Sequence, residues 1–338
     1  MEFSTFHILA VPPWTTEERT IQTEMRSIRL ADDLGFDGVW MAEHSGSDYG
    51  TMGNPALMLA AAAACTKRVR LGTAVSIVPL HDPLRLAEEY ALVDQLSGGR
   101  LELGVGRGYQ PIEFNRYGIN ISENRPRFQE IVEIIRAAWA SEGPFEYEGM
   151  FYQIPPTNVH PRPLQRPHPP MWIAQGSIET MEWAGRQLIP FMAAPLLPHN
   201  VLLSRKEAYV QAAVEFGHPE ADARKTADSF WHLKNVFVAD TDQKAKDYAE
   251  RSLMWFFAEL NSRRMFEAPA EPQPYEFYLN SNGFFWGTPD RVADQIRKCS
   301  EETGGQRIIC WFDHGGMDPE ALDRCLRLFG EQVIPQFK

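Results

Sequence analysis

Short apolar segments alternate with longer amphipathic segments along the whole chain. Each apolar segment is six to ten residues of β-branched or other apolar side chains, and each amphipathic segment repeats apolar positions at helical spacing. The pattern predicts eight strands, at 6–11, 38–43, 69–78, 101–106, 170–175, 190–195, 232–239 and 307–312. Strands separated by helices pair in parallel, and eight of them most economically close into a (β/α)8, or TIM, barrel.

A doubly wound open sheet is the alternative architecture. That fold usually carries a G-x-G-x-x-G loop after its first strand. Here the first predicted strand runs instead into two prolines at 12–13, and Gly104, Gly106 and Gly108 follow the fourth strand with a different spacing. These glycines indicate room for close backbone approach. We therefore expect a single barrel domain over residues 1–338.

Two long segments interrupt the regular alternation. Residues 144–170 hold a predicted hairpin that turns near Glu148 and then a proline-rich stretch, and residues 264–285 are rich in proline, glutamate and aromatics. Both exceed the usual two to six residues of a connection, so we interpret them as insertions at the carboxyl-terminal face of the barrel. The second insertion would lie over the barrel mouth, as a mobile lid or as a plain surface loop.

Charge and cysteine content narrow the possible partners and the compartment. The formal net charge of −12 would repel nucleic acid and anionic membranes, so neither is expected as a partner. The four cysteines have no paired short spacing and are interpreted as reduced thiols or small core residues, not as a disulfide or zinc framework. The first residues lack a basic leader, and their apolar run is too short for a signal core or a membrane span. A cytoplasmic protein is the expectation.

Candidate chemical residues lie just after the predicted strands, where a parallel barrel gathers its active site. The second strand ends in Glu43 and His44, and Arg107 follows the fourth between Gly106 and Gly108. His44 can act as an acid or a base near neutral pH, although a buried structural histidine would have the same sequence signal. Arg107 can reach a bound oxyanion because its neighbours lack a Cβ, or it can pair with a surface carboxylate.

Two predicted helix starts also suit an anion. Ser177 and Thr180 follow Gly176 after the fifth strand, and residues 287–289 open the helix before the last strand. Serine and threonine are common N-caps, and a helix N-terminus is also a phosphate site, so the two interpretations are compatible. The scattered histidines argue against a metal site, and the absence of a G-x-S-x-G elbow argues against a serine hydrolase.

Several stretches together resemble one known family. They are GFDGVWMAEH, GNPALMLAAAAACTKRVRLGTAVSIVPLHDP, LAEEYALVDQLSGGRLELGVGRG, GSIETMEWAG and GTPDRVADQI. They resemble the luciferase-like flavin monooxygenase superfamily, and within it the type of the bacterial luciferase alpha subunit and alkanal monooxygenase. The resemblance implies a TIM barrel with a flavin ring at its mouth and a non-proline cis peptide between Ala74 and Val75. It assigns cofactor binding to Ala74, Val75, Gly106, Arg107, Gly176, Ser177 and Thr180.

The resemblance also implies an activity. Glu43 and His44 match the catalytic dipeptide of the family, in which the histidine acts near the reactive edge of the flavin. The implied enzyme is a two-component monooxygenase: a separate flavin reductase supplies reduced FMN, O2 is captured as a flavin hydroperoxide, and a small organic substrate is oxygenated. A deazaflavin-dependent oxidoreductase that transfers hydride is one alternative, and a non-catalytic flavin-binding subunit is another. Residues 54–66 and 83–96 match the helices through which the family forms dimers, so a homodimer is expected.

Two positions depart from the relatives closest to luciferase. Ser45 stands where those relatives carry a second histidine, and Gly106 stands where a cysteine is often found. Both departures argue against light emission and a long-chain aldehyde substrate. Aromatic residues expected near the mouth suit an apolar or aromatic substrate, or simply barrel packing; they are Trp14, Tyr109, Trp172, Phe191, Phe284, Phe285, Trp286 and Trp311.

Overall fold

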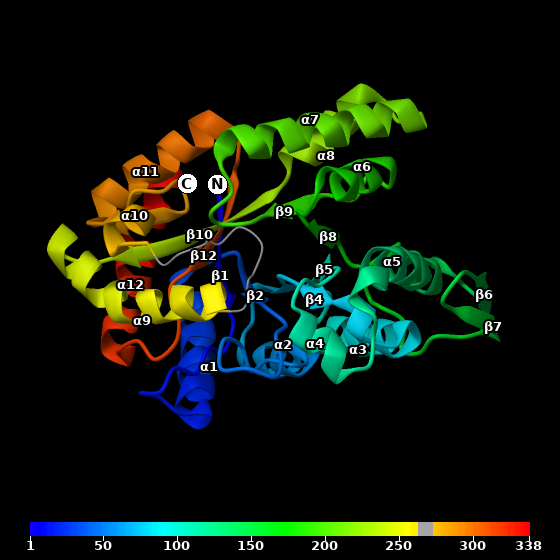
Figure 1. The fold of residues 1–338 in the computed structure, drawn as a ribbon, viewed down its shortest axis with the longest axis horizontal. Helices are drawn as coiled ribbons and strands as arrows, with labels where there is room; N and C mark the ends of the chain where they lie inside the picture. Colours follow the sequence, from blue (N-terminus) through cyan, green and yellow to red (C-terminus); the bar gives the residue numbers. More distant parts are fainter. Residues whose placement is uncertain (263–272) are drawn as a thin grey trace.

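A closed ring of eight parallel strands forms the centre of the protein in the computed structural model, which describes residues 1–262 and 273–338 (Figure 1). In ring order the strands are β1 (Glu2–His7), β2 (Gly38–Met41), β3 (Arg70–Thr73), β5 (Leu101–Gly106), β8 (Met171–Ala174), β9 (Phe191–Ala193), β10 (Trp231–Val238) and β12 (Arg307–Trp311). Pairing of β12 with β1 and of β10 with β9 closes the ring. The predicted TIM barrel is confirmed, and its eight strands are the eight that the sequence pattern indicated.

The bounds of the first strand differ from the prediction. β1 begins at Glu2, which pairs with Arg307, and it ends at His7 instead of continuing to residue 11. Leu9 has a φ of 55°, in the left-handed region, and an extended strand cannot pass through that conformation. Ile8 therefore lies beyond the end of the strand, where it lines the cavity at the barrel mouth.

A ninth parallel strand in the main sheet lies in the region interpreted as an insertion. β11 (Phe284–Gly287) pairs with the last four residues of β10, on the same edge where β9 pairs with the first two. The short β4 (Ser76–Ile77) likewise extends the sheet beside β5. Residues 284–285, at the end of the segment expected to be an insertion, are therefore part of the main sheet. Four apolar residues after a stretch rich in proline and glutamate give too short a pattern to be recognised as a strand.

Helices surround the ring, and several of them begin or end at residues that favour those positions. Side chains of Thr16, Asn54, Asp82 and Asp318 accept hydrogen bonds from first-turn N–H groups, and several helices end at glycines with positive φ. The helices are α1 (Glu17–Leu34), α2 (Pro55–Cys65), α3 (Pro83–Ser97), α4 (Pro111–Arg116), α5 (Asn124–Ala140), α6 (Ile178–Arg186), α7 (His199–Phe216), α8 (Glu220–Asp228), α9 (Asp242–Ser262), α10 (Tyr275–Leu279), α11 (Pro289–Thr303) and α12 (Pro319–Leu328). None of the helices within the described ranges is long and apolar enough to cross a membrane.

The two predicted insertions have different outcomes. β6 (Phe145–Glu148) and β7 (Gln153–Thr157) pair antiparallel and form the hairpin expected in the first one (Figure 1). In the second, residues 263–272 lie outside the described residues, and the rest contains α10 and the start of β11. The lid remains a prediction.

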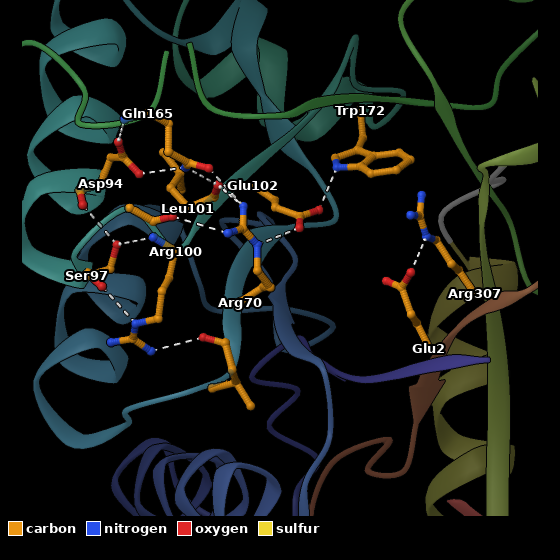
Figure 2. Close-up of polar contacts among 12 residues, drawn as sticks. Glu2, Arg70, Asp94, Ser97, Arg100, Leu101, Glu102, Gln165, Trp172 and Arg307 are labelled. Carbon is orange, nitrogen blue, oxygen red and sulfur yellow. Dashed lines mark hydrogen bonds and ion pairs between the residues drawn. The ribbon is translucent and has the colours of Figure 1, made fainter. Parts of the chain in front are cut away.

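The amino ends of the strands are closed by packing and hydrogen bonds. Trp40, Trp172 and Trp231 fill the barrel interior. The ring centroid of Trp231 lies 5.3 Å from that of Trp40 and 6.2 Å from that of Trp172. Glu102 accepts from Arg70 Nε at 2.7 Å and from Trp172 Nε1 at 2.8 Å, as Figure 2 shows. The sequence position of Trp172 had indicated the mouth of the barrel. Its hydrogen bond to Glu102 instead holds it at the floor. Within the described residues, packed side chains thus fill the amino-terminal end of the barrel.

Candidate active site

A cavity of about 460 Å³ opens at the carboxyl ends of the strands. Its wall includes residues from the ends of β2, β3, β5, β8 and β9 and from the second half of α9. Nine site residues predicted from the sequence lie on this wall: Glu43, His44, Ala74, Val75, Gly106, Arg107, Gly176, Ser177 and Thr180. These residues are up to 137 positions apart in the sequence. They line the same cavity because the barrel brings the carboxyl ends of its strands to one face. Residues 287–289, the other predicted helix start suited to an anion, do not line the cavity.

His44 is buried at one side of the cavity, with 7% of its surface exposed. Its Nδ1 lies 2.9 Å from Oε1 of Glu113, on α4, and its Nε2 lies 3.5 Å from the hydroxyl of Tyr109. The imidazole packs edge-on against Tyr49, with centroids 4.9 Å apart. Burial raises the pKa of Tyr109 well above its ordinary value, and Tyr49 and the charge of Glu113 act in the same direction. The Tyr109 hydroxyl therefore stays protonated at neutral pH.

Glu43 holds the neighbouring strand end in place. Its carboxylate accepts from Ser76 Oγ at 3.0 Å and from the Ile77 N–H at 2.8 Å, and it pairs with His81 Nε2 at 2.7 Å. Burial lowers the pKa of His81, but the hydrogen bond and charge of Glu43, with the charge of Glu89, outweigh burial and raise it. The carboxylate of Glu43 is thus bonded to β4 and His81.

The peptide bond between Ala74 and Val75 is cis, as the family resemblance implied. The Val75 carbonyl accepts from the Glu43 N–H at 3.1 Å, which ties this segment to β2. Across it, a Cβ on Gly106 would stand 2.4 Å from Val75 Cγ2. A side chain at position 106 would force Val75 to move, so glycine there fits the position of Val75 in this chain. This contact gives a physical reason for the departure from the family cysteine.

Polar groups suited to an anion gather at the other side of the cavity. Arg107 has no hydrogen-bond partner among the described residues, and burial together with the charge of Arg125 lowers its pKa. Arg125, from α5, donates to Ser177 Oγ at 3.0 Å. Ser177 stands at the N-cap position of α6 without a side-chain capping hydrogen bond, and its hydroxyl lies 3.4 Å from Thr180 Oγ1. Arg125 also pairs with Glu179 Oε2 at 3.4 Å, and it does not line the cavity itself. The guanidinium of Arg107, two hydroxyls and a helix N-terminus therefore form the donor set that suits a phosphate.

Several lining or supporting residues were not found from the sequence. Glu113 and Arg125 lie within helices, where charged residues usually mark a solvated face, and no motif distinguishes them. Phe256 and Phe257 on α9 have the spacing of ordinary core residues, yet they line the cavity. Of the aromatics expected near the mouth, Tyr109 and Trp311 line the cavity, and the other six do not. Their depth along the barrel depends on strand register, which the sequence pattern does not specify.

The described residues contain no group of three or more His, Cys, Asp or Glu side chains arranged to hold a metal ion. The charged side chains on the cavity wall are Glu43, Arg107 and Arg205, and Glu43 is paired with His81. The cavity therefore offers excess positive charge within a chain of net charge −12. This arrangement suits an organic ligand with an anionic group at one end.

The family model and the similar proteins all indicate the same family. Residues 1–307 match the family model described as Luciferase-like monooxygenase. The chain is 28% identical to the oxygenase component of the flavin-dependent trigonelline monooxygenase of Acinetobacter baylyi, covering 100% of this chain and 96% of that protein. It is 25% identical to the alkanal monooxygenase alpha chain of the Kryptophanaron alfredi symbiont, and the match covers 100% of this chain and 99% of that protein.

Solved structures agree in fold. The monooxygenase RslO1 from Streptomyces bottropensis superposes with a TM-score of 0.89 at 29% identity, over 100% of both chains. Two more distant structures show the fold alone. One is the oxygenating constituent of 3,6-diketocamphane monooxygenase from Pseudomonas putida in complex with FMN, with a TM-score of 0.81 at 24% identity over 100% and 99% of the chains. The other is an F420-dependent secondary alcohol dehydrogenase, with a TM-score of 0.75 at 18% identity over 100% and 99%.

Proposed function

Because the chain belongs to the luciferase-like monooxygenase family, we propose that it is the oxygenase component of a two-component, FMN-dependent monooxygenase. A separate reductase supplies reduced FMN. One atom of O2 enters a small organic substrate and the other leaves as water, with the two electrons and two protons taken from the reduced flavin. The observation that carries this proposal is one cavity with a phosphate-suited donor set at one side and a buried histidine at the other.

The residues present fit FMN. Its phosphate would bind Arg107, Ser177 and Thr180, where the donors already converge and the guanidinium of Arg107 has no hydrogen-bond partner among the described residues. Its ring would lie against the Ala74–Val75 segment. Because Gly106 has no side chain, nothing at position 106 crowds Val75. When bound, the reduced flavin supplies the electrons and the site of reaction with O2.

The chain's own residues would then orient, protect and move protons. His44 would take up or release a proton at Nε2, the ring nitrogen opposite Glu113. Glu43 would act by holding β4 and the Ala74–Val75 segment, since its carboxylate is already bonded to Ser76, Ile77 and His81. Phe256, Phe257 and Trp311 give the cavity an apolar wall, which favours exclusion of water during the reaction.

Hydride transfer with a deazaflavin is the alternative chemistry. The similarity to an F420-dependent dehydrogenase is at 18% identity and concerns the fold, whereas the proteins at 28% and 29% identity are both named monooxygenases. A non-catalytic flavin-binding subunit is less compatible with the site, because such a subunit would not need the buried pair of His44 and Glu113.

Turnover in 18O2 tests the proposed reaction. Purified protein, a flavin reductase, NADH and FMN are mixed with small apolar cyclic and aromatic compounds, which suit the aromatic wall. We expect a product that carries one 18O atom and whose yield depends on this chain. Oxygen taken from water instead of O2, or the same yield with reductase and flavin alone, would contradict a monooxygenase.

We also propose that the protein forms a homodimer through α2 and α3. These two helices pack against each other and expose Leu57 (71% of its surface), Leu92 (49%) and Leu96 (58%). A second copy of the same face would cover these leucines, as in the dimers of the family. The expected mass in solution is therefore twice that of the 38.5 kDa chain.

Charge on this face should separate the dimer. Replacement of Leu57 and Leu96 by aspartate places like charges in the apolar contact, and the mass by analytical ultracentrifugation should fall to that of one chain. Phe216→Asp is the matched control, because Phe216 is 63% exposed on α7, and it should leave the dimer intact. A wild-type monomer at micromolar concentration, or a dimer that persists in the double variant, would contradict this interface.

A further inference from the structure

We infer that Glu113 is a positioning residue that holds His44 as the Nδ1–H tautomer and leaves Nε2 free on the cavity side. Glu113 lies near the middle of the short helix α4 and is 1% exposed. Its Oε1 is 2.9 Å from His44 Nδ1 and also accepts from the Ser45 N–H at 3.1 Å. The consequence for proton transfer depends on the proposed function, but the tautomer itself does not.

The hydrogen-bond chemistry of the carboxylate sets the tautomer. An ionised carboxylate only accepts hydrogen bonds, so the ring nitrogen that faces it has to be the donor. The Ser45 N–H fixes Oε1 at this place, because it bonds the same oxygen. The other oxygen, Oε2, is buried without a hydrogen-bond partner among the described residues. Within that part of the chain, the hydrogen bonds of Glu113 therefore come from the His44 ring and its neighbouring main chain.

Gln110 makes the choice of tautomer depend on Glu113. Its amide nitrogen lies 3.0 Å from His44 Nδ1, and its oxygen has no hydrogen-bond partner among the described residues. The Nδ1–H tautomer requires the amide of Gln110 to be turned by a half rotation, so that its unpartnered oxygen faces Nδ1–H as a second acceptor. With Glu113 removed, the same amide can donate to a bare Nδ1, and the ring proton would move to Nε2.

The opposite side of the ring agrees with a free Nε2. The Tyr109 hydroxyl lies 3.5 Å from Nε2, and a phenolic hydroxyl can donate to a ring nitrogen that carries no proton. In this state Nε2 can take up a proton from the cavity, and the carboxylate at Nδ1 then stabilises the charged ring. The pair would work as histidine and carboxylate do in hydrolase triads, where the acid orients the base without taking its proton.

Nitrogen-15 NMR of protein labelled at histidine tests the tautomer without cofactor or substrate. The His44 signal is assigned by its loss in His44→Gln. At pH 8 we expect the Nδ1–H tautomer in wild type, its retention in Glu113→Gln, whose amide oxygen can still accept, and a change to Nε2–H in Glu113→Leu. His7 is the internal control, because its Nδ1 lies 2.5 Å from Glu24 Oε2 and its signal should stay the same in all variants.

Two outcomes would overturn the inference. One is an Nε2–H signal for His44 in the wild-type protein, which can be read even if a variant does not fold. The other is an unchanged His44 signal in folded Glu113→Leu. For the working enzyme, Glu113→Leu should lower coupled oxygenation about tenfold while reduced-FMN affinity stays unchanged. A tautomer that depends on Glu113 in a protein without oxygenase activity would reject the proposed function and keep the positioning role.

Discussion

Replacement of His44 by alanine is expected to remove coupled oxygenation while reduced FMN still binds. The imidazole is buried at the cavity wall, bonded to Glu113 on one side and near Tyr109 on the other, and the phosphate-suited donors lie elsewhere on the wall. Loss of a positioned acid or base typically costs about 10²–10⁴-fold in rate. Product formed per NADH consumed should therefore fall by that order, and the electrons should appear as hydrogen peroxide.

The matched control for this variant is His218→Ala. His218 bonds the Arg186 carbonyl at 2.8 Å and does not line the cavity, so its removal should leave both binding and turnover unchanged. A His44→Ala protein that forms product at the wild-type rate would exclude His44 from the reaction. A protein that has also lost FMN binding would place His44 in the cofactor site instead.

Replacement of Arg107 by alanine is expected to weaken FMN binding by roughly 1.5–3 kcal/mol, or about 10- to 150-fold in Kd, the scale of a charge-assisted hydrogen bond. The guanidinium has no hydrogen-bond partner among the described residues, so a bound phosphate would be its partner. Riboflavin, which has the same ring without the phosphate, should bind wild type and variant equally. Equilibrium titration of both flavins measures the two effects.

The comparison of the two flavins makes the outcome decisive. An equal loss of FMN and riboflavin affinity would mean that Arg107 supports the ring or the fold and not the phosphate. Unchanged FMN affinity would refute the phosphate assignment altogether. Arg136→Ala provides a structural control, because Arg136 bonds Gln187 at 3.2 Å and does not line the cavity.

The sequence allowed prediction of those site residues that directly follow a strand of the barrel. Alternating apolar and amphipathic segments indicated eight parallel strands, and a parallel barrel places all their carboxyl ends at one face. Polar residues directly after those strands, such as His44, Arg107 and Ser177, therefore had to lie near one another, and they do line one cavity. The roles of individual residues came from the family resemblance and remain proposals.

Other features depend on information that a one-dimensional pattern does not contain. Glu113 reaches His44 because a short helix turns back after β5, and the turn depends on packing. Phe256 and Phe257 lie on α9, where a residue that lines a cavity and a core residue have the same spacing. Trp172 was expected at the mouth but lies at the floor, since its depth depends on where β8 enters the barrel.

The most direct test of the central claim is an anaerobic titration with reduced FMN and, separately, with reduced deazaflavin, followed by rapid mixing of each complex with O2. We predict tight, saturable binding of reduced FMN and, after mixing, a transient absorption spectrum that differs from those of reduced and oxidised flavin. Binding of deazaflavin alone with no reaction with O2 would contradict the account and indicate hydride transfer. Direct appearance of oxidised FMN, at the rate of free flavin, would contradict it as well.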